Sequence, residues 1–135
     1  MSRPFEILEH TADIGFRAWG ATEPELFANA AAATIAISYE PDAVAERETR
    51  DLVATGDDRE SLMVNWLQEL LWLIDGEGWL PRRIAVHTIT ATSIAGTAHG
   101  EPRDASRHEF NVIVKAVTYH QIKIGSNEAE VFLDI

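Results

Sequence analysis

The sequence contains no cysteine, which excludes disulfide bonds, thiolate metal sites and a thiol nucleophile. It also lacks an apolar run near the ~18 residues of a membrane span. The longest candidate, residues 62–74, is interrupted by Asn65, Gln68 and Glu69. The first ten residues, MSRPFEILEH, lack the apolar stretch of a secretory signal peptide. We therefore expect a cytoplasmic protein that does not insert into a membrane.

Basic residues are scarce as well. The chain has 11 Lys and Arg against 22 Asp and Glu, so its formal net charge is −11. Because nucleic-acid binding relies mainly on Lys and Arg that meet phosphates, we expect no tight direct binding to RNA. Such a charge suits a cation or a basic protein partner, and it serves solubility equally well.

The chain is long enough for one domain with a core of its own, and we expect a single domain over residues 1–135. The residues TEPE at 22–25 have the form of a capping box, with Thr22 as N-cap and Glu25 at the third position. They precede an apolar, alanine-rich helix that reaches about Ser38. Asp57 or Asp58 is suited to cap a second helix, whose wide apolar stripe ends at DGEG, residues 75–78.

The rest of the chain favours strands. Runs rich in Ile, Val and Thr predict about six of them, over 14–19, 49–55, 83–92, 93–101, 110–124 and 130–135, with 49–55 at a sheet edge and 101–108 as a polar loop. Helices and strands do not alternate regularly. We therefore expect an α+β fold, with a mixed sheet and two main helices packed mainly on one face.

Two stretches place polar residues at or inside strands. His10 and Asp13 precede the strand at 14–19, where such residues usually satisfy backbone N–H groups. Lys115 shares an alternation face with Ile113 and Val117, so it is expected partly among apolar neighbours, where a counter-carboxylate would help. His120 falls on the opposite, apolar face, as a hydrogen-bonded core histidine unless a bulge re-aims it.

A third polar feature is the final stretch, VFLDI at 131–135. It sets Asp134 beside the α-carboxylate of Ile135, and a nearby metal ion or lysine would relieve their repulsion. The sequence holds no HExxH motif, EF-hand loop, glycine-rich phosphate loop or nucleophile elbow. Motif spacing by itself therefore leaves the function open.

Taken together, these stretches resemble the archease family. The resemblance rests on HTADIGFRAWG at 10–20, ELFANAAAA at 25–33, DRESLMVNWLQELLWLID at 58–75, VKAVTYH at 114–120 and VFLDI at 131–135. It implies an accessory protein, not an enzyme, that activates an RtcB-type RNA ligase in tRNA splicing and RNA repair. Activation means promoting ligase guanylylation and multiple turnover. The resemblance also implies a mixed sheet with helices.

The resemblance further implies a divalent-metal site at Asp13, Asp134 and Ile135, and a functionally important lysine at Lys115, with His10 and His120 as possible support. Oxygen ligands of this kind suit Ca²⁺ or Mg²⁺ better than zinc. Three residues do not fill such a coordination sphere, so waters or a partner's groups would complete it.

Two other functions remain open at this point. One is a stand-alone metal-dependent hydrolase, in which Asp13 and Asp134 hold the metal and His10 or His120 acts as base. The other is a general chaperone or scaffold that binds through its acidic surface.

Overall fold

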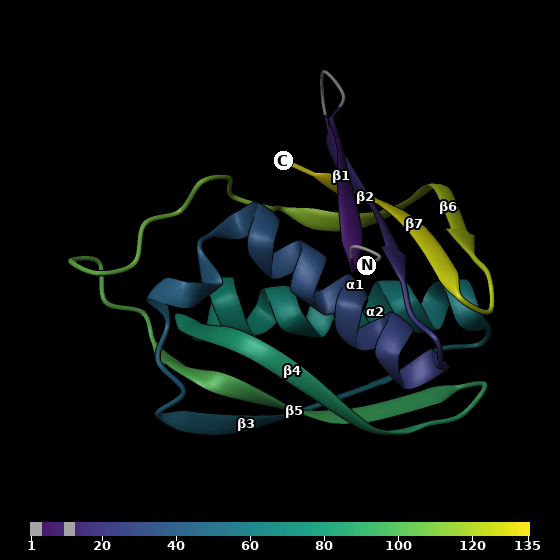
Figure 1. Ribbon diagram of the computed structural model, residues 1–135, viewed down its shortest axis with the longest axis horizontal. Coiled ribbons are helices and arrows are strands. Elements are labelled where there is room, and N and C mark those ends of the chain that lie inside the picture. The colour runs from purple at the N-terminus through teal and green to yellow at the C-terminus, as the bar shows by residue number, and fades with distance from the viewer. Residues whose placement is uncertain (1–3, 10–12) are drawn as a thin grey trace.

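The computed structural model describes residues 4–9 and 13–135 of the chain. These residues form two α-helices, seven β-strands and two short helical turns (Figure 1). The helices are α1 (Glu23–Ser38) and α2 (Arg59–Leu71). The turns are a 3-10 turn, η1 (Pro41–Ala43), and a π-helical turn, η2 (Trp72–Gly76). The strands are β1 (Phe5–Glu9), β2 (Asp13–Trp19), β3 (Glu48–Thr55), β4 (Trp79–Ile89), β5 (Ser93–Pro102), β6 (Ala116–Ile124) and β7 (Glu128–Asp134).

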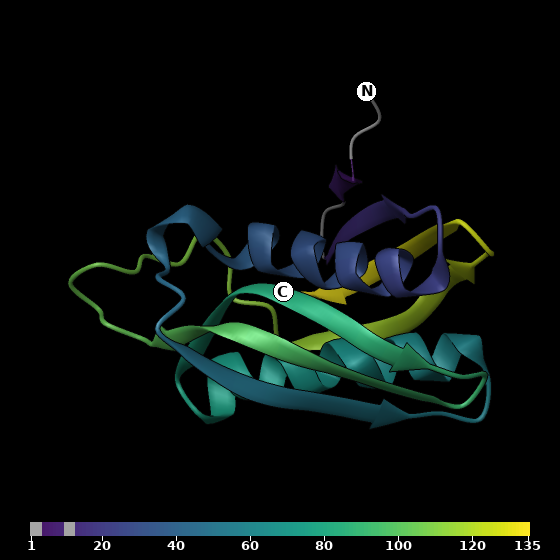
Figure 2. The same ribbon diagram turned by 60° about the horizontal axis from the view of Figure 1, so that its bottom comes forward.

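The strands divide between two sheets. One has the order β1-β2-β7-β6 and the other β3-β5-β4, and every ladder in them is antiparallel. Figure 1 shows the two helices between the four-stranded sheet above and the three-stranded sheet below. In Figure 2, α1 runs along β4. The α+β class and the two main helices are confirmed, whereas the one mixed sheet that we expected is two antiparallel sheets.

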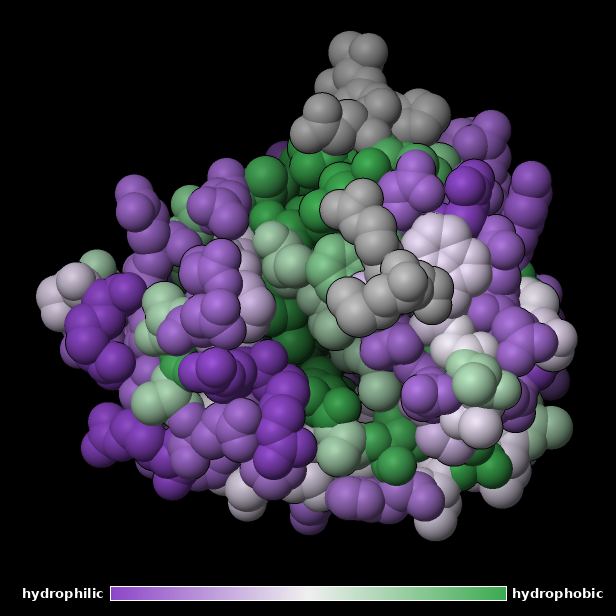
Figure 3. Space-filling model, viewed as in Figure 1, coloured by the Kyte–Doolittle hydropathy of each residue, from purple (hydrophilic) through white to green (hydrophobic). Residues whose placement is uncertain are grey.

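Helix α1 explains why one sheet is not enough. Its buried residues, from Leu26 to Ser38, lie on all sides of the helix, and no charged residue follows Glu25. A helix that is apolar all round has to be covered on more than one side. Accordingly α1 contacts β2 in one sheet and β4 in the other, and α2 contacts β6 and β3. The apolar strip in Figure 3 runs over α1, between polar side chains.

Both helices begin where the capping signals predict. The Thr22 hydroxyl accepts a hydrogen bond from the backbone N–H of Glu25, and the Glu25 carboxylate accepts one from the N–H of Ala21 at 2.9 Å. Asp58 is the cap of α2, where its side chain accepts from the N–H of Ser61 at 2.8 Å. Among the helices of the described residues, none is both long and apolar enough to cross a bilayer.

The strand boundaries agree less well. The edge strand expected at 49–55 is β3, and the strand expected at 83–92 is β4, which begins four residues earlier and ends three residues earlier. The long strand expected over 110–124 begins only at Ala116. The reason is that Ala116 pairs with Asp134, the last residue of β7, so the residues before Ala116 have no ladder partner there. Phe110 instead forms an isolated bridge with Tyr39.

Candidate functional site

Strands β2 and β7 bring two aspartates together. Asp13 lies directly opposite Asp134 in the antiparallel ladder, and Ala116 of β6 lies opposite Asp134 on its other side. Directly opposed side chains lie on the same face of a sheet, with Cβ atoms about 4.5–5.5 Å apart in general. The sequence prediction that these two carboxylates share one rim therefore agrees with the ladder, although 121 positions separate them in the chain.

The face that carries the aspartates points away from the helices. Along β2, Phe16 and Ala18 are fully buried in the core, and Leu133 of β7 joins them. Asp13 and Gly15 alternate with these residues, so they lie on the outer face. On that face the Phe132 ring covers Gly15, and a Cβ atom added to Gly15 would lie 2.6 Å from Phe132 Cε1. Glycine at position 15 thus makes room for the Phe132 ring on the outer face of β2.

One carboxylate oxygen of the pair has no hydrogen-bond partner in the described part of the chain. Asp13 Oδ1 is buried and accepts no hydrogen bond from any described residue. Buried polar atoms are nearly always paired, and an exception calls for an explanation such as an ion. Asp134 is exposed, and Ile135 is half-buried against the core, which holds the main chain close to Asp134. This donor set, two carboxylates and a main-chain oxygen, fits a hard divalent cation.

The described residues supply no further side-chain ligand. They contain no group of three or more His, Asp or Glu side chains arranged to hold a metal ion. Neither Asp13 nor Asp134 forms an ion pair with a described Lys, Arg or His. A cation on this pair would therefore need oxygens from water or from a partner.

Lys115 is joined to the same rim through its backbone. Its N–H donates to the carbonyl of Asp134 at 2.7 Å. We expected its side chain partly among apolar neighbours, and this is wrong: Lys115 is exposed, and it lies just before β6 begins. Within the described part of the chain its ammonium group has no ion-pair partner, so it is available to a partner molecule.

Of the two histidines, His10 lies outside the described residues. His120 is exposed, and its ring lies edge-on to Phe132 at a centroid distance of 6.3 Å. A register shift between Thr118 and Lys123, with Gln121 at φ 54°, re-aims this part of β6. His120 therefore belongs to the outer face that carries the aspartates, and the core histidine that simple alternation predicted is wrong.

Lys115 and Asp134 are exposed on this rim, and Asp13 is half-buried. A cavity of about 700 Å³ lies at the other end of β2, where it is lined by Trp19, Glu25 and Asn29 among others. Asp13, Lys115 and Asp134 do not line it. An open rim is accessible to a macromolecular surface, whereas a small-molecule enzyme usually encloses its substrate.

Sequence reasoning missed a second polar cluster. Residues 101–108, which we expected to form a polar loop, include two buried side chains, Glu101 and His108. Hydrogen bonds from Arg107 and from the N–H of Ala45 lower the pKa of Glu101 from 4.5 to about 2, against the opposing effect of burial. The signal in the sequence was an acid, an arginine and a histidine within eight residues, but such a pattern is common in solvated loops.

Three comparisons with known proteins agree with one another. The sequence model of the Archease protein family (MTH1598/TM1083) matches residues 5–135. Protein archease of Sulfurisphaera tokodaii is 39% identical over 121 residues, which cover 89% of this chain and 87% of that protein. Protein archease of Methanosarcina mazei is 37% identical over 141 residues, with 98% and 97% covered. The solution structure of Methanobacterium thermoautotrophicum protein 1598 superposes with a TM-score of 0.77 at 32% identity, covering 98% and 99% of the two chains.

Proposed function

This chain belongs to the archease family, and on that premise we propose that it is an accessory protein that activates an RtcB-type RNA ligase. In this role it promotes guanylylation of the ligase and its multiple turnover during tRNA splicing and RNA repair, and it works beside the ligase in the cytoplasm. The observation that carries the proposal is the rim on which Asp13, Asp134 and Lys115 meet.

A divalent cation, Ca²⁺ or Mg²⁺, is part of this proposal. The carboxylates of Asp13 and Asp134 and the main-chain oxygen of Ile135 would hold it, and the unpartnered Asp13 Oδ1 supports this assignment. When bound there, the cation supplies positive charge and open coordination positions to a partner's groups. The chain itself provides the rigid register of β2 on β7, which holds the two carboxylates in place before the ligase arrives.

Lys115 contributes a second positive charge next to the first. Its backbone is fixed to Asp134, while its side chain is exposed and has no ion pair with a described residue. A lysine in this state can meet a phosphate of GTP or a carboxylate of the ligase without first breaking an internal contact. The exposure of Lys115 and Asp134 on this rim favours activation of a partner over hydrolysis by the protein alone.

One mixing experiment tests the proposal. The protein is combined with an RtcB-type ligase, GTP, Mn²⁺ and RNA that carries a 3′-phosphate, and ligase–GMP and ligated RNA are followed over many turnovers. We expect stimulation at sub-stoichiometric amounts of the protein. An unrelated acidic protein of similar charge serves as the control, because equal stimulation by it would indicate a general chaperone effect. Release of phosphate or nucleotide by the protein alone would indicate a hydrolase.

A further inference from the structure

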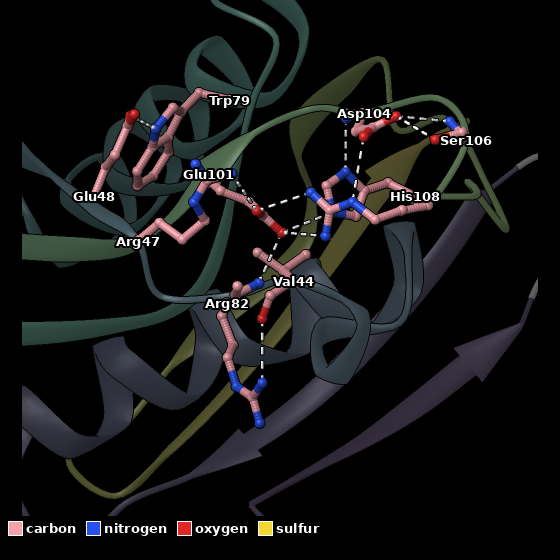
Figure 4. A network of polar contacts seen from close by, with 11 residues as sticks. Val44, Arg47, Glu48, Trp79, Arg82, Glu101, Asp104, Ser106 and His108 are labelled. Atoms are coloured by element: carbon pink, nitrogen blue, oxygen red, sulfur yellow. Dashed lines mark hydrogen bonds and ion pairs between the residues drawn. The ribbon is translucent and has the colours of Figure 1, made fainter.

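Glu101 is the centre of a buried polar cluster at the end of β5. Its side chain is fully buried, and its carboxylate accepts hydrogen bonds from Arg107 Nη2 at 3.0 Å and Nη1 at 3.3 Å, from His108 Nε2 at 2.9 Å and from the N–H of Ala45 at 2.8 Å. Arg47 adds an ion pair at 3.6 Å. Figure 4 shows these contacts converging on Glu101. A buried carboxylate with this many donors is held in one orientation.

His108 is equally constrained. Its Nδ1 accepts a hydrogen bond from the backbone N–H of Asp104 at 2.8 Å, so Nε2 carries the proton that is donated to Glu101. The Asp104 carboxylate in turn accepts from Ser106 and Arg107, which closes the turn between Asp104 and His108. Both ring nitrogens of His108 are therefore used, and the ring cannot rotate without breaking a buried hydrogen bond.

The chain that leaves this cluster leads to Lys115. In Figure 1 it forms the long loop that projects at the left, between β5 and β6. From His108 onward it alternates: His108, Phe110, Val112 and Val114 point inward, whereas Glu109, Asn111, Ile113 and Lys115 are exposed. Such a period of two is typical of an extended strand, in which a slip by one residue moves every side chain to the other side.

A backbone ladder does not fix this register. The described backbone hydrogen bonds of residues 109–115 to other segments are from Asn111 N–H to Ser38 and from Lys115 N–H to Asp134, together with the isolated bridge of Phe110. Between these backbone contacts, and before Phe110, the inward side chains set the register. Among them His108 alone forms a buried hydrogen bond to a carboxylate, whereas Phe110 contacts the Tyr39 ring and Val114 packs as an apolar core residue.

We propose that Glu101 is a positioning residue, which through His108 and together with the backbone contacts at Phe110, Asn111 and Lys115 fixes the register of residues 108–115 and so helps to hold Lys115 outward on the metal rim. The part of this inference that concerns ligase stimulation by Lys115 rests on the proposed function. The part that concerns the register of residues 108–115 does not depend on that function. Removing the charge of Glu101 should leave the two sheets intact and loosen the segment that ends at Lys115.

The test uses Glu101→Gln, which keeps the shape of the side chain, in the full-length protein. Glu23→Gln is the matched control, because Glu23 also pairs with an arginine from a distant segment, Arg59, yet touches nothing in the loop. Hydrogen exchange is measured for amides 109–115 and for β7, together with Ca²⁺ affinity and ligase stimulation. In Glu101→Gln we expect exchange at 109–115 to rise by about tenfold or more, with β7 unchanged. Ca²⁺ binding should persist, and maximal stimulation should fall.

The outcomes separate this inference from the function it rests on. Unchanged hydrogen exchange at 109–115 in a folded Glu101→Gln protein would overturn the inference. It would also be overturned if exchange at 109–115 rises but Glu101→Gln still stimulates the ligase fully, in an assay where Lys115→Ala does not stimulate it. If the wild-type protein gives no stimulation, the proposed function fails, and the exchange data alone decide whether Glu101 sets the register. If Glu101→Gln does not fold, Arg107→Ala, at a half-exposed partner, is measured in the same way and judged by the same results.

Discussion

Asp13 and Asp134 belong to strands at opposite ends of the sequence, and the β2–β7 register makes them neighbours. Asp13→Asn and Asp134→Asn should each weaken Ca²⁺ or Mg²⁺ binding by more than about tenfold, since even residues behind the ligands have effects of that size. Thermal stability in EDTA should be unchanged or higher, because the substitution removes a like-charge repulsion. Calorimetric titration and melting curves check this, with Glu128→Gln on the same strand as control. Wild-type affinity in both variants would disprove the site.

The side chain of Lys115 is exposed, and only its backbone is held by a hydrogen bond, to Asp134. We therefore expect the side chain to contribute to binding a partner and not to the stability of the fold. Lys115→Ala should change the free energy of unfolding by no more than about 0.5 kcal/mol and abolish ligase stimulation. Lys123→Ala is the matched control, because Lys123 is also an exposed lysine and lies further along, in β6, opposite Glu130. Urea unfolding and the ligation assay provide the measurements. Normal stimulation by a folded Lys115→Ala protein would show that the lysine is merely solvated.

At the scale of elements, the packing of the Phe132 ring of β7 over β2 depends on Gly15. An alanine there places its Cβ 2.6 Å from the Phe132 ring, so the ring or the strand must shift. We expect Gly15→Ala to lower the free energy of unfolding by about 1–3 kcal/mol, as overpacking usually does. Metal affinity should fall with it, because Phe132 and Asp134 share that face of β7. Gly125→Ala is the control, since its nearest contact would be 3.4 Å. Equal urea midpoints for the two variants would contradict this account.

The helices could be predicted from the sequence because their signals are local. Each cap is formed by residues close together in the chain: Thr22 with Glu25, and Asp58 with Ser61. Both caps form at the positions that the sequence indicates. The first and last residues of a strand depend on its partner strand, which can lie a hundred residues away in the chain. The segment 110–115 has the composition of a strand, but β7 ends at Asp134 and offers it no further ladder. Its side chains still alternate between inward and exposed positions, because the inward ones pack against the rest of the protein.

In the candidate site, too, the features with a local signal could be predicted and those that depend on distant contacts could not. The resemblance carried by short motifs was enough to single out Asp13, Lys115 and Asp134, and the ladder brings all three to one rim. The direction of the Lys115 and His120 side chains could not be predicted, because it depends on where β6 begins and on a register shift within it. Glu101 could not be found either. Its burial depends on donors from three segments, and no local pattern encodes their meeting.

For the whole molecule, the charge of −11 and the state of its arginines predict weak RNA binding. Seven of them are already in ion pairs with Asp or Glu: Arg17, Arg47, Arg50, Arg59, Arg82, Arg83 and Arg107. Few positive charges remain to release counterions from phosphates. The dissociation constant for bare tRNA at physiological salt should be weaker than about 1 µM. Fluorescence anisotropy over a salt series checks this, and a tight complex with a steep salt dependence would refute it.

Glu101 also links the stability of the whole protein to pH, because it joins β5, the segment before β3 and the long loop. Its pKa is about 2 in the folded protein against an ordinary 4.5, chiefly because Arg107 hydrogen-bonds the charged form. A lowered pKa contributes stability that is fully present above pH 4.5 and is lost as the pH falls toward 2.

Glu101→Gln has no carboxyl group at this position to titrate. The difference in unfolding free energy between wild type and Glu101→Gln should therefore be constant from pH 7 to 5 and shrink steadily below 4.5. A difference between wild type and Glu101→Gln that stays constant down to pH 2.5 would mean that the carboxylate contributes only its shape.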